Sequence, residues 1–183
     1  MKKVLRSLLM TVMALCFSLP CLSSVEAASV ALLPLINNVQ GDEVANQVFY
    51  KEAIATMNAQ KGFFMVENAK LTAAIESVNV GSEVPSEAAA AKIAKGGDVD
   101  FVIAMQLDKI EDENIFASSE DQIKVTVKGK VISYNRLTGE YRVRKINEET
   151  LTPAVFASRW DLAHEEWGKV VRKEIKKALS AKK

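Results

Sequence analysis

Cysteine and histidine are almost absent from this chain of 183 residues, which contains Cys16, Cys21 and the single histidine His164. Ser-His and Cys-His nucleophile systems need a histidine beside the nucleophile, and zinc hydrolysis needs several ligands around an open position. The segment HEEW begins like a zinc-protease motif, but the second histidine of that motif is missing. We therefore expect no catalytic residues, no metal site and no cofactor, and we interpret His164 as a histidine on a helix surface or at a groove edge.

A surplus of charge of one sign is also missing. The 24 Lys and Arg residues nearly balance the 23 Asp and Glu residues, which gives a formal net charge of +1. Proteins that bind nucleic acids rely on excess positive charge, so we expect no nucleic-acid partner. A phosphate-binding glycine loop must open a helix, whereas Gly96 and Gly97 precede a predicted strand.

The first 27 residues have the features of a secretory signal peptide. Basic residues at 2–6 are followed by a short apolar stretch at 8–19 and then by small residues. The apolar stretch is too short and too interrupted for an ordinary membrane span. The small-x-small rule predicts cleavage after Ala27, which leaves a single domain at 28–183 and removes both cysteines. The predicted location is periplasmic or extracellular.

Cys21 supports an alternative interpretation of the same segment as a lipoprotein signal. A lipid-modified cysteine normally follows a small residue, and Pro20 stands at that position here. Cleavage after Ala27 is therefore our first expectation, and membrane attachment through Cys21 is the alternative.

The rest of the chain alternates between short apolar runs and amphipathic helical patterns. We expect an α/β fold in the order β-α-β-α-α-β-β-β-α, with a single mixed sheet. Its core strands are parallel through right-handed crossovers, a later antiparallel hairpin extends it, and helices pack on it. The predicted strands are 29–37, 63–67, 100–110, 121–134 and 141–146, and the predicted helices are 43–59, 69–78, 86–95 and 158–182. Asp42, Asn68 and Ser86 are expected at helix starts.

Acidic residues are concentrated between the third and fourth predicted strands. The ordered spacing and the glycine bend of a calcium loop are missing, so we interpret this segment as a solvated acidic loop. Its members are Asp108, Glu111, Asp112, Glu113, Glu120 and Asp121.

The last predicted helix carries both tryptophans on one apolar stripe. Trp160 and Trp167 are expected to pack this helix on the sheet, with one of them as a partner anchor in the alternative interpretation. Glu174 falls within the same stripe. Either it pairs with a basic group or the helix end is partly exposed, and we take it as a hint of an exposed end. The basic residues near this end are expected to be solvated, with contact to anionic lipid as the alternative.

Taken together, these segments resemble a family of bacterial envelope domains. The family contains the curli-secretion lipoprotein and the penicillin-binding-protein activator lipoproteins, and the chain is also similar to the amino-terminal domain of the periplasmic Tol translocation protein. The resemblance implies partner binding and envelope assembly rather than catalysis. It rests on the segments VALLPLINN, GFFMVENAKLTAAI, AAAAKIAKGGDVDFVIAMQLDKI and KVTVKGKVISYNRLTGEY.

The function predicted from the sequence is an exported, non-enzymatic interaction or assembly module of the cell envelope. We expect an envelope protein as its partner and self-association as a further property. The alternative is a small-molecule or ion-binding domain that uses the crevice at the carboxyl ends of the parallel strands, where Asn37, Asn38 and Asn68 gather. The predicted interaction surface consists of Asn37, Asn38, Asp42, Trp160, His164 and Trp167.

Overall fold

The computed structural model describes residues 27–117, 120–153 and 158–180. The predicted signal segment up to residue 26, including Cys16 and Cys21, lies outside the described residues. The elements in chain order are β1 (Ala28–Leu32), β2 (Ile36–Asn37), α2 (Glu43–Asn58), β3 (Phe63–Met65), α3 (Ala69–Glu76), α4 (Glu87–Gly97), β4 (Phe101–Ala117), β5 (Glu120–Asn135), β6 (Glu140–Pro153) and α5 (Arg159–Ser180).

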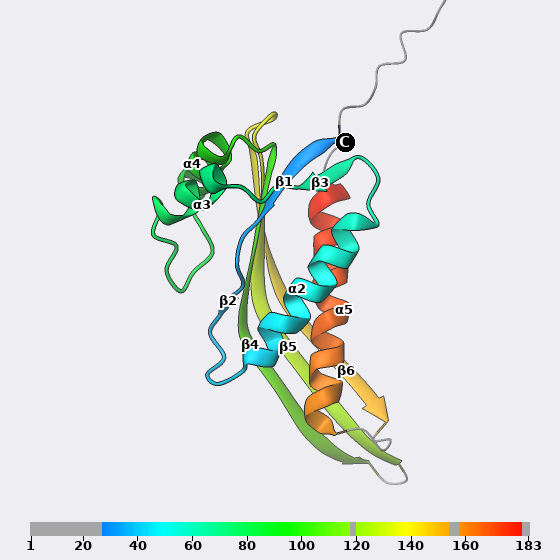
Figure 1. Cartoon of the computed structure of the whole chain (residues 1–183). Helices are drawn as coiled ribbons and strands as arrows, with labels where there is room; N and C mark the ends of the chain where they lie inside the picture. The colour runs from blue at the N-terminus through cyan, green and yellow to red at the C-terminus, as the bar shows by residue number, and fades with distance from the viewer. Residues whose placement is uncertain (1–26, 118–119, 154–157, 181–183) are drawn as a thin grey trace, which may run out of the picture.

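The strands form one mixed sheet in the order β3-β1-β4-β5-β6, with β2 paired to β4 (Figure 1). β1 is parallel to both β3 and β4, whereas β4, β5 and β6 are joined as antiparallel neighbours. This confirms the predicted α/β fold and the predicted element order. The added element is β2, because the first predicted strand is interrupted by Pro34, which has no backbone N–H to donate to a ladder.

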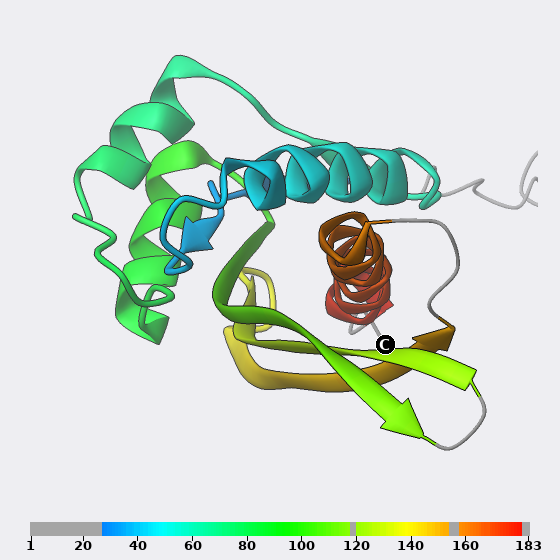
Figure 2. The ribbon, with the colours of Figure 1, turned by 90° about the horizontal axis from the view of Figure 1, so that it is seen from below.

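Helices cover the two faces of the sheet unequally. Figure 2 shows α5 lying between α2 and the strands β4–β6, where their apolar side chains form the larger core around Phe49, Met105 and Trp167. On the opposite face, α3 and α4 cover only the part of the sheet near β1 and the start of β4 (Figure 1). Their smaller core contains Leu71, Ile93 and neighbouring residues. In the far part of β4–β6, α5 covers one face, and none of the described helices covers the other.

The structure contradicts the prediction of a solvated acidic loop. β4 continues through Asp108, Glu111, Asp112 and Glu113, and β5 begins at Glu120, so these residues belong to a long antiparallel hairpin. Ile110 opposes Val127 and is buried with it under α5. Glu111 and Glu113 are exposed on the face opposite Ile110, whereas Asp112 lies on the same face as Ile110 and pairs with Arg159 of α5. Charged side chains on a strand give the same composition as a loop.

A β-bulge divides this hairpin into two parts. The β4–β5 register shifts between Leu107 and Lys109, opposite Gly129. A β-carbon placed on Gly129 would lie 2.1 Å from the backbone oxygen of Gln106. Glycine is therefore required at this position because the two backbones approach too closely for any side chain.

The end of α5 is part of the core, which contradicts the expectation of an exposed helix end. Glu174 is only 5% exposed, and Ala178 and Leu179 beyond it are fully packed. Arg144 Nε donates to Glu174 Oε2 at 3.0 Å, and Lys177 Nζ donates to Glu174 Oε1 at 2.9 Å. The pairing alternative is therefore correct, because these two cations offset the cost of burying the carboxylate.

We predict that Gly129→Ala lowers the free energy of unfolding by about 1–3 kcal/mol or more, because the added methyl group overlaps the backbone of β4. Gly81→Ala is the matched control, since nothing lies within 4 Å of its β-carbon position. Urea unfolding of both variants measures the difference. Equal stability of the two variants would contradict the close approach at the bulge.

Candidate functional site

A partly open groove of about 610 Å³ is the candidate functional site. One wall is the segment Leu33–Asn38, which runs from the end of β1 through β2. The other wall is contributed by Ile75, Glu76 and the segment Asn79–Ser82, which follow one another at the end of α3. Apolar side chains dominate the first wall, the second wall adds Ile75 and Val80, and Glu76 is the only charged residue among the lining residues.

β2 places an incompletely paired strand along this groove. Ile36 and Asn37 pair in parallel with Gln106 and Leu107 of β4. Within the described parts of the chain, β4 is the only strand that pairs with β2. A strand has hydrogen-bonding groups along both of its edges, and the second edge of β2 has no strand partner among the described residues.

The buried side chain of Gln106 holds the wall that follows α3. Its side chain is 1% exposed, and its Oε1 accepts a hydrogen bond from the Val84 backbone N–H at 3.0 Å. Its Nε2 donates to Asp108 Oδ1 at 2.5 Å. The same carboxylate oxygen accepts from Asn38 Nδ2 at 2.9 Å, and Asn38 Nδ2 also donates to the Ser82 backbone oxygen at 3.1 Å. This network connects both walls of the groove to β4.

Two contacts from β5 and β6 hold the loop that contains Glu83 and Pro85. Lys130 Nζ donates to Glu83 Oε2 at 2.5 Å, and Tyr141 Oη donates to the Pro85 backbone oxygen at 2.7 Å. The hydrogen bond with Glu83 raises the pKa of Lys130 above its ordinary value, and nearby negative charges add to this effect. Burial, together with the negative charge of Glu87, raises the pKa of Tyr141. Lys130 therefore stays charged, and Tyr141 stays protonated, at neutral pH.

Four of the six residues predicted as an interaction surface form a hydrogen-bonded joint where α2 and α5 begin. Asn37 Nδ2 donates to the Asp42 backbone oxygen at 2.6 Å. The Asp42 carboxylate caps α2 by accepting from Ala45 N, and it lies 2.9 Å from His164 Nε2. His164 Nδ1 is 2.7 Å from the Trp160 backbone oxygen.

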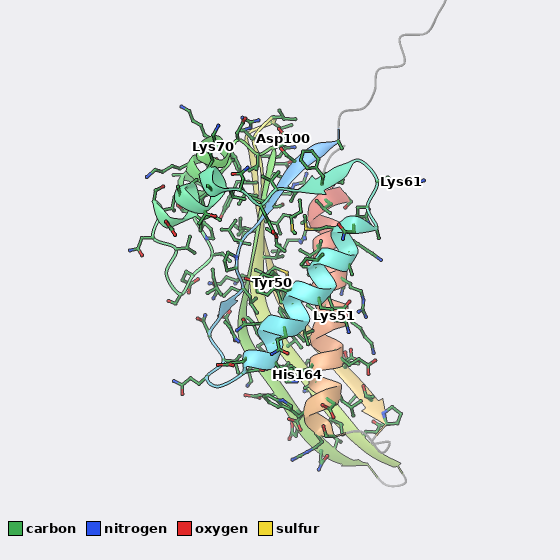
Figure 3. All side chains as sticks on the ribbon, viewed as in Figure 1. Tyr50, Lys51, Lys61, Lys70, Asp100 and His164 are labelled. Atoms are coloured by element: carbon green, nitrogen blue, oxygen red, sulfur yellow. The ribbon has the colours of Figure 1, made fainter. Side chains whose placement is uncertain are left out.

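His164 is only 5% exposed, which contradicts its interpretation as a surface or groove-edge histidine. It lies on α5 near the start of α2 (Figure 3). Both of its ring nitrogens face oxygen atoms that can accept hydrogen bonds, one from Asp42 and one from Trp160. When both ring nitrogens carry protons, each donates to the oxygen that it faces, and the ring forms an ion pair with Asp42. Its visible role is to connect α2 to α5.

The six predicted residues differ in their access to solvent. Asp42, His164 and Trp167 are buried, and Trp167 Nε1 donates to the Ala45 backbone oxygen at 3.1 Å. Trp167 thus packs α5 as expected, whereas Trp160 is 45% exposed. Asn37 and Asn38 lie in the groove wall.

The predicted gathering of Asn37, Asn38 and Asn68 is only partly present. Asn68 caps α3 by accepting from Leu71 N and is not among the groove residues. Sequence analysis missed the groove wall that follows α3. The sequence signal that could have indicated it is Gln106, a polar residue inside an otherwise apolar run, because a buried amide needs hydrogen-bond partners from another segment.

The described residues contain no group of three or more His, Cys, Asp or Glu side chains that could hold a metal ion. None of the described helices is long and apolar enough to cross a membrane.

No family model matches the chain, and no curated protein matches its sequence. Several solved structures do match. The hypothetical protein CT253 from Chlamydia trachomatis matches with 12% identity and a TM-score of 0.48, over 84% of this chain and 98% of that chain. Lipoprotein GNA1162 from Neisseria meningitidis matches with 13% identity and a TM-score of 0.44, over 80% of this chain and 96% of that chain.

LpoB from E. coli matches with 12% identity and a TM-score of 0.40, over 69% of this chain and 58% of that chain. The matched structures thus include bacterial lipoproteins. The similarity to the Tol translocation protein stays a prediction.

We predict that His164→Ala lowers the free energy of unfolding by about 1–3 kcal/mol, because the buried Asp42 carboxylate loses one of its two hydrogen-bonding partners and keeps the backbone N–H of Ala45. Glu165→Ala is the matched control on the same helix, since the ion pair of Glu165 with Lys169 is exposed and exposed pairs contribute little to stability. Chemical unfolding followed by tryptophan fluorescence measures both variants. A loss for His164→Ala no greater than that for the control would show that the joint does not stabilise the fold.

Proposed function

We propose that this chain is an exported, non-enzymatic protein of the bacterial cell envelope that binds an extended segment of a partner protein. The observation that carries the proposal is the groove whose wall includes β2, a strand that pairs only with β4 among the described strands. A partner segment adds alongside β2 through backbone hydrogen bonds, which is a common mode of peptide recognition.

The chemistry of the walls favours a peptide with apolar side chains. Leu33, Leu35 and Ile36 lie on one side, and Ile75 and Val80 lie on the other. Alternate side chains of an added strand point to opposite faces, so one set contacts these apolar residues. Backbone pairing supplies affinity, and the apolar walls supply selectivity.

The location follows from the amino-terminal sequence. Basic residues, a short apolar stretch and a small-x-small site ending at Ala27 together favour export and cleavage. β1 begins at Ala28, whose backbone N–H donates to the Gly62 oxygen at 2.9 Å. The first residue expected after cleavage is therefore also the first residue of the sheet.

A second candidate function is the binding of a small molecule in the same groove. Its volume of about 610 Å³ falls within the usual range of ligand pockets, roughly 300–1,000 Å³. Such pockets also contain a few convergent polar groups that orient the ligand. Here the side chain of Asn38 is already bonded to Asp108 and Ser82, so we favour the extended segment.

A photoreactive amino acid in place of Glu76 tests the proposal. Glu76 is exposed and lines the groove, so a bound partner segment lies within reach of this position. We expect irradiation of producing cells to yield one discrete adduct with an exported protein. Peptide mapping is expected to place the link in an extended segment of that partner.

Lys95 is the matched control position, because it is exposed on α4 and does not line the groove. The same adduct from both positions, or none from Glu76, would contradict a protein partner in the groove. A thermal shift with a metabolite extract, in the absence of any protein adduct, would favour the small-molecule function.

We further predict that the protein recovered from its native compartment begins at Ala28. Mass spectrometry of the intact protein measures this directly. An acylated chain that begins at Cys21 would contradict cleavage after Ala27 and show that the protein is a lipoprotein. An uncleaved chain in the cytosol would contradict export.

A further inference from the structure

β6 is a long strand with one free edge. It spans Glu140–Pro153 and pairs only with β5 among the described strands. The other edge of the sheet is β3, which has only three residues. Long free edges can pair with another chain, and proteins usually protect them. In this protein, β6 is the edge where pairing with another chain would bury the most backbone.

The two faces of β6 differ in composition. Even-numbered residues face α5: Ile146 is buried, Arg144 bonds to Glu174, and Glu148 bonds to Lys173. Because side chains alternate along a strand, the odd-numbered residues from Val143 onward face the other side of the sheet. On that side, Val143 is 51% exposed and Leu151 is 58% exposed.

The odd-numbered residues are arranged symmetrically about Asn147. Val143 and Leu151 are each four residues away from it, and Lys145 and Glu149 are each two residues away. An antiparallel pair of β6 strands related by a two-fold axis through Asn147 therefore sets Val143 opposite Leu151 and Lys145 opposite Glu149. Opposed apolar pairs and opposite charges both stabilise antiparallel strands.

Neighbouring registers lack this complementarity. A two-fold axis at Lys145, Glu148 or Glu149 places two like charges directly opposite each other, which is destabilising. An axis at Ile146 sets the exposed Val143 against Glu149. The register centred on Asn147 is thus favoured over its neighbours on both sides.

Among the described residues, no acidic side chain forms an ion pair with Lys145. Its cross-strand neighbour in β5 is Lys130, which pairs with Glu83. No ion pair involving Lys145 is present in the described part of the structure, and a second copy would bring Glu149 to it.

We propose that two copies of this chain associate through β6, antiparallel and about a two-fold axis at Asn147, to form one continuous sheet. This surface is separate from the groove, so either proposal can fail without the other. The partner is a second copy because an antiparallel copy of β6 presents the same charges in reverse order, so that Glu149 meets Lys145.

Cysteine cross-linking tests the register. In full-length protein carrying Cys16→Ser and Cys21→Ser, we expect Asn147→Cys to form a disulfide-linked dimer on oxidation, because the residue on the axis opposes itself. Lys145→Cys alone is the matched control, since its two copies would be about 14 Å apart, beyond disulfide reach. A mixture of Lys145→Cys and Glu149→Cys chains is expected to cross-link.

Cross-linking of a Lys145→Cys and Asn147→Cys mixture instead would place the axis at Ile146 and overturn this register. Similar yields from Asn147→Cys and Lys145→Cys alone would overturn ordered pairing altogether.

Sedimentation equilibrium tests the association without cross-links. We expect a concentration-dependent dimer, and we expect Glu149→Lys to raise its dissociation constant at least about tenfold by opposing two lysines. The double variant Lys145→Glu with Glu149→Lys restores the opposite charges and is expected to recover the dimer. A monomer at all concentrations, or no rescue by the double variant, would refute the proposal.

Discussion

The close approach of β5 to β4 at Gly129 is the constraint on which the rest of the structure depends. The missing side chain lets β4 bulge between Leu107 and Lys109. Just before the bulge, Gln106 points away from the larger core and holds Val84 and Asp108. One side of the hairpin thus completes the core under α5, while the other side fixes the wall of the groove. A glycine in a strand therefore connects the packing of the protein to its candidate binding site.

Charged and polar residues inside the fold act as connectors between elements. Glu174 connects α5 to β6 through Arg144, and the Asp42–His164 pair connects α2 to α5. Each group is buried, and each has hydrogen-bond partners that offset the loss of water. These contacts fix how the helices sit on the sheet, which apolar packing alone specifies less strictly. The groove and the free edge of β6 are the surfaces that we propose for binding.

The sequence predicted the fold well because the fold depends on local patterns. Alternation at Ile123, Val125 and Val127 identified a strand with one buried face, and Asp42 and Asn68 were correctly expected as helix caps. The acidic end of β4 was wrongly interpreted as a loop, because a strand with a charged face looks like a loop until its pairing partner is known. Pairing between distant segments is a property of the whole fold and cannot be seen in a local window.

The candidate site was predicted less well for the same reason. Asn37 and Asn38 were expected near a crevice and do line the groove. The facing wall comes from a loop after α3, held by Gln106 across a separation of 22 residues. His164 was expected at a surface, but its burial depends on Asp42, 122 residues away. Neither contact has a periodic signature in the sequence.

The most direct test of this account is backbone hydrogen exchange across β2. The protein would be recovered from the cell envelope with its bound partner and compared with the same protein freed of that partner. The account predicts slower exchange of the Ile36 and Asn37 amides and of the groove wall in the bound form. Unchanged exchange at β2, with protection confined to other surfaces, would contradict it.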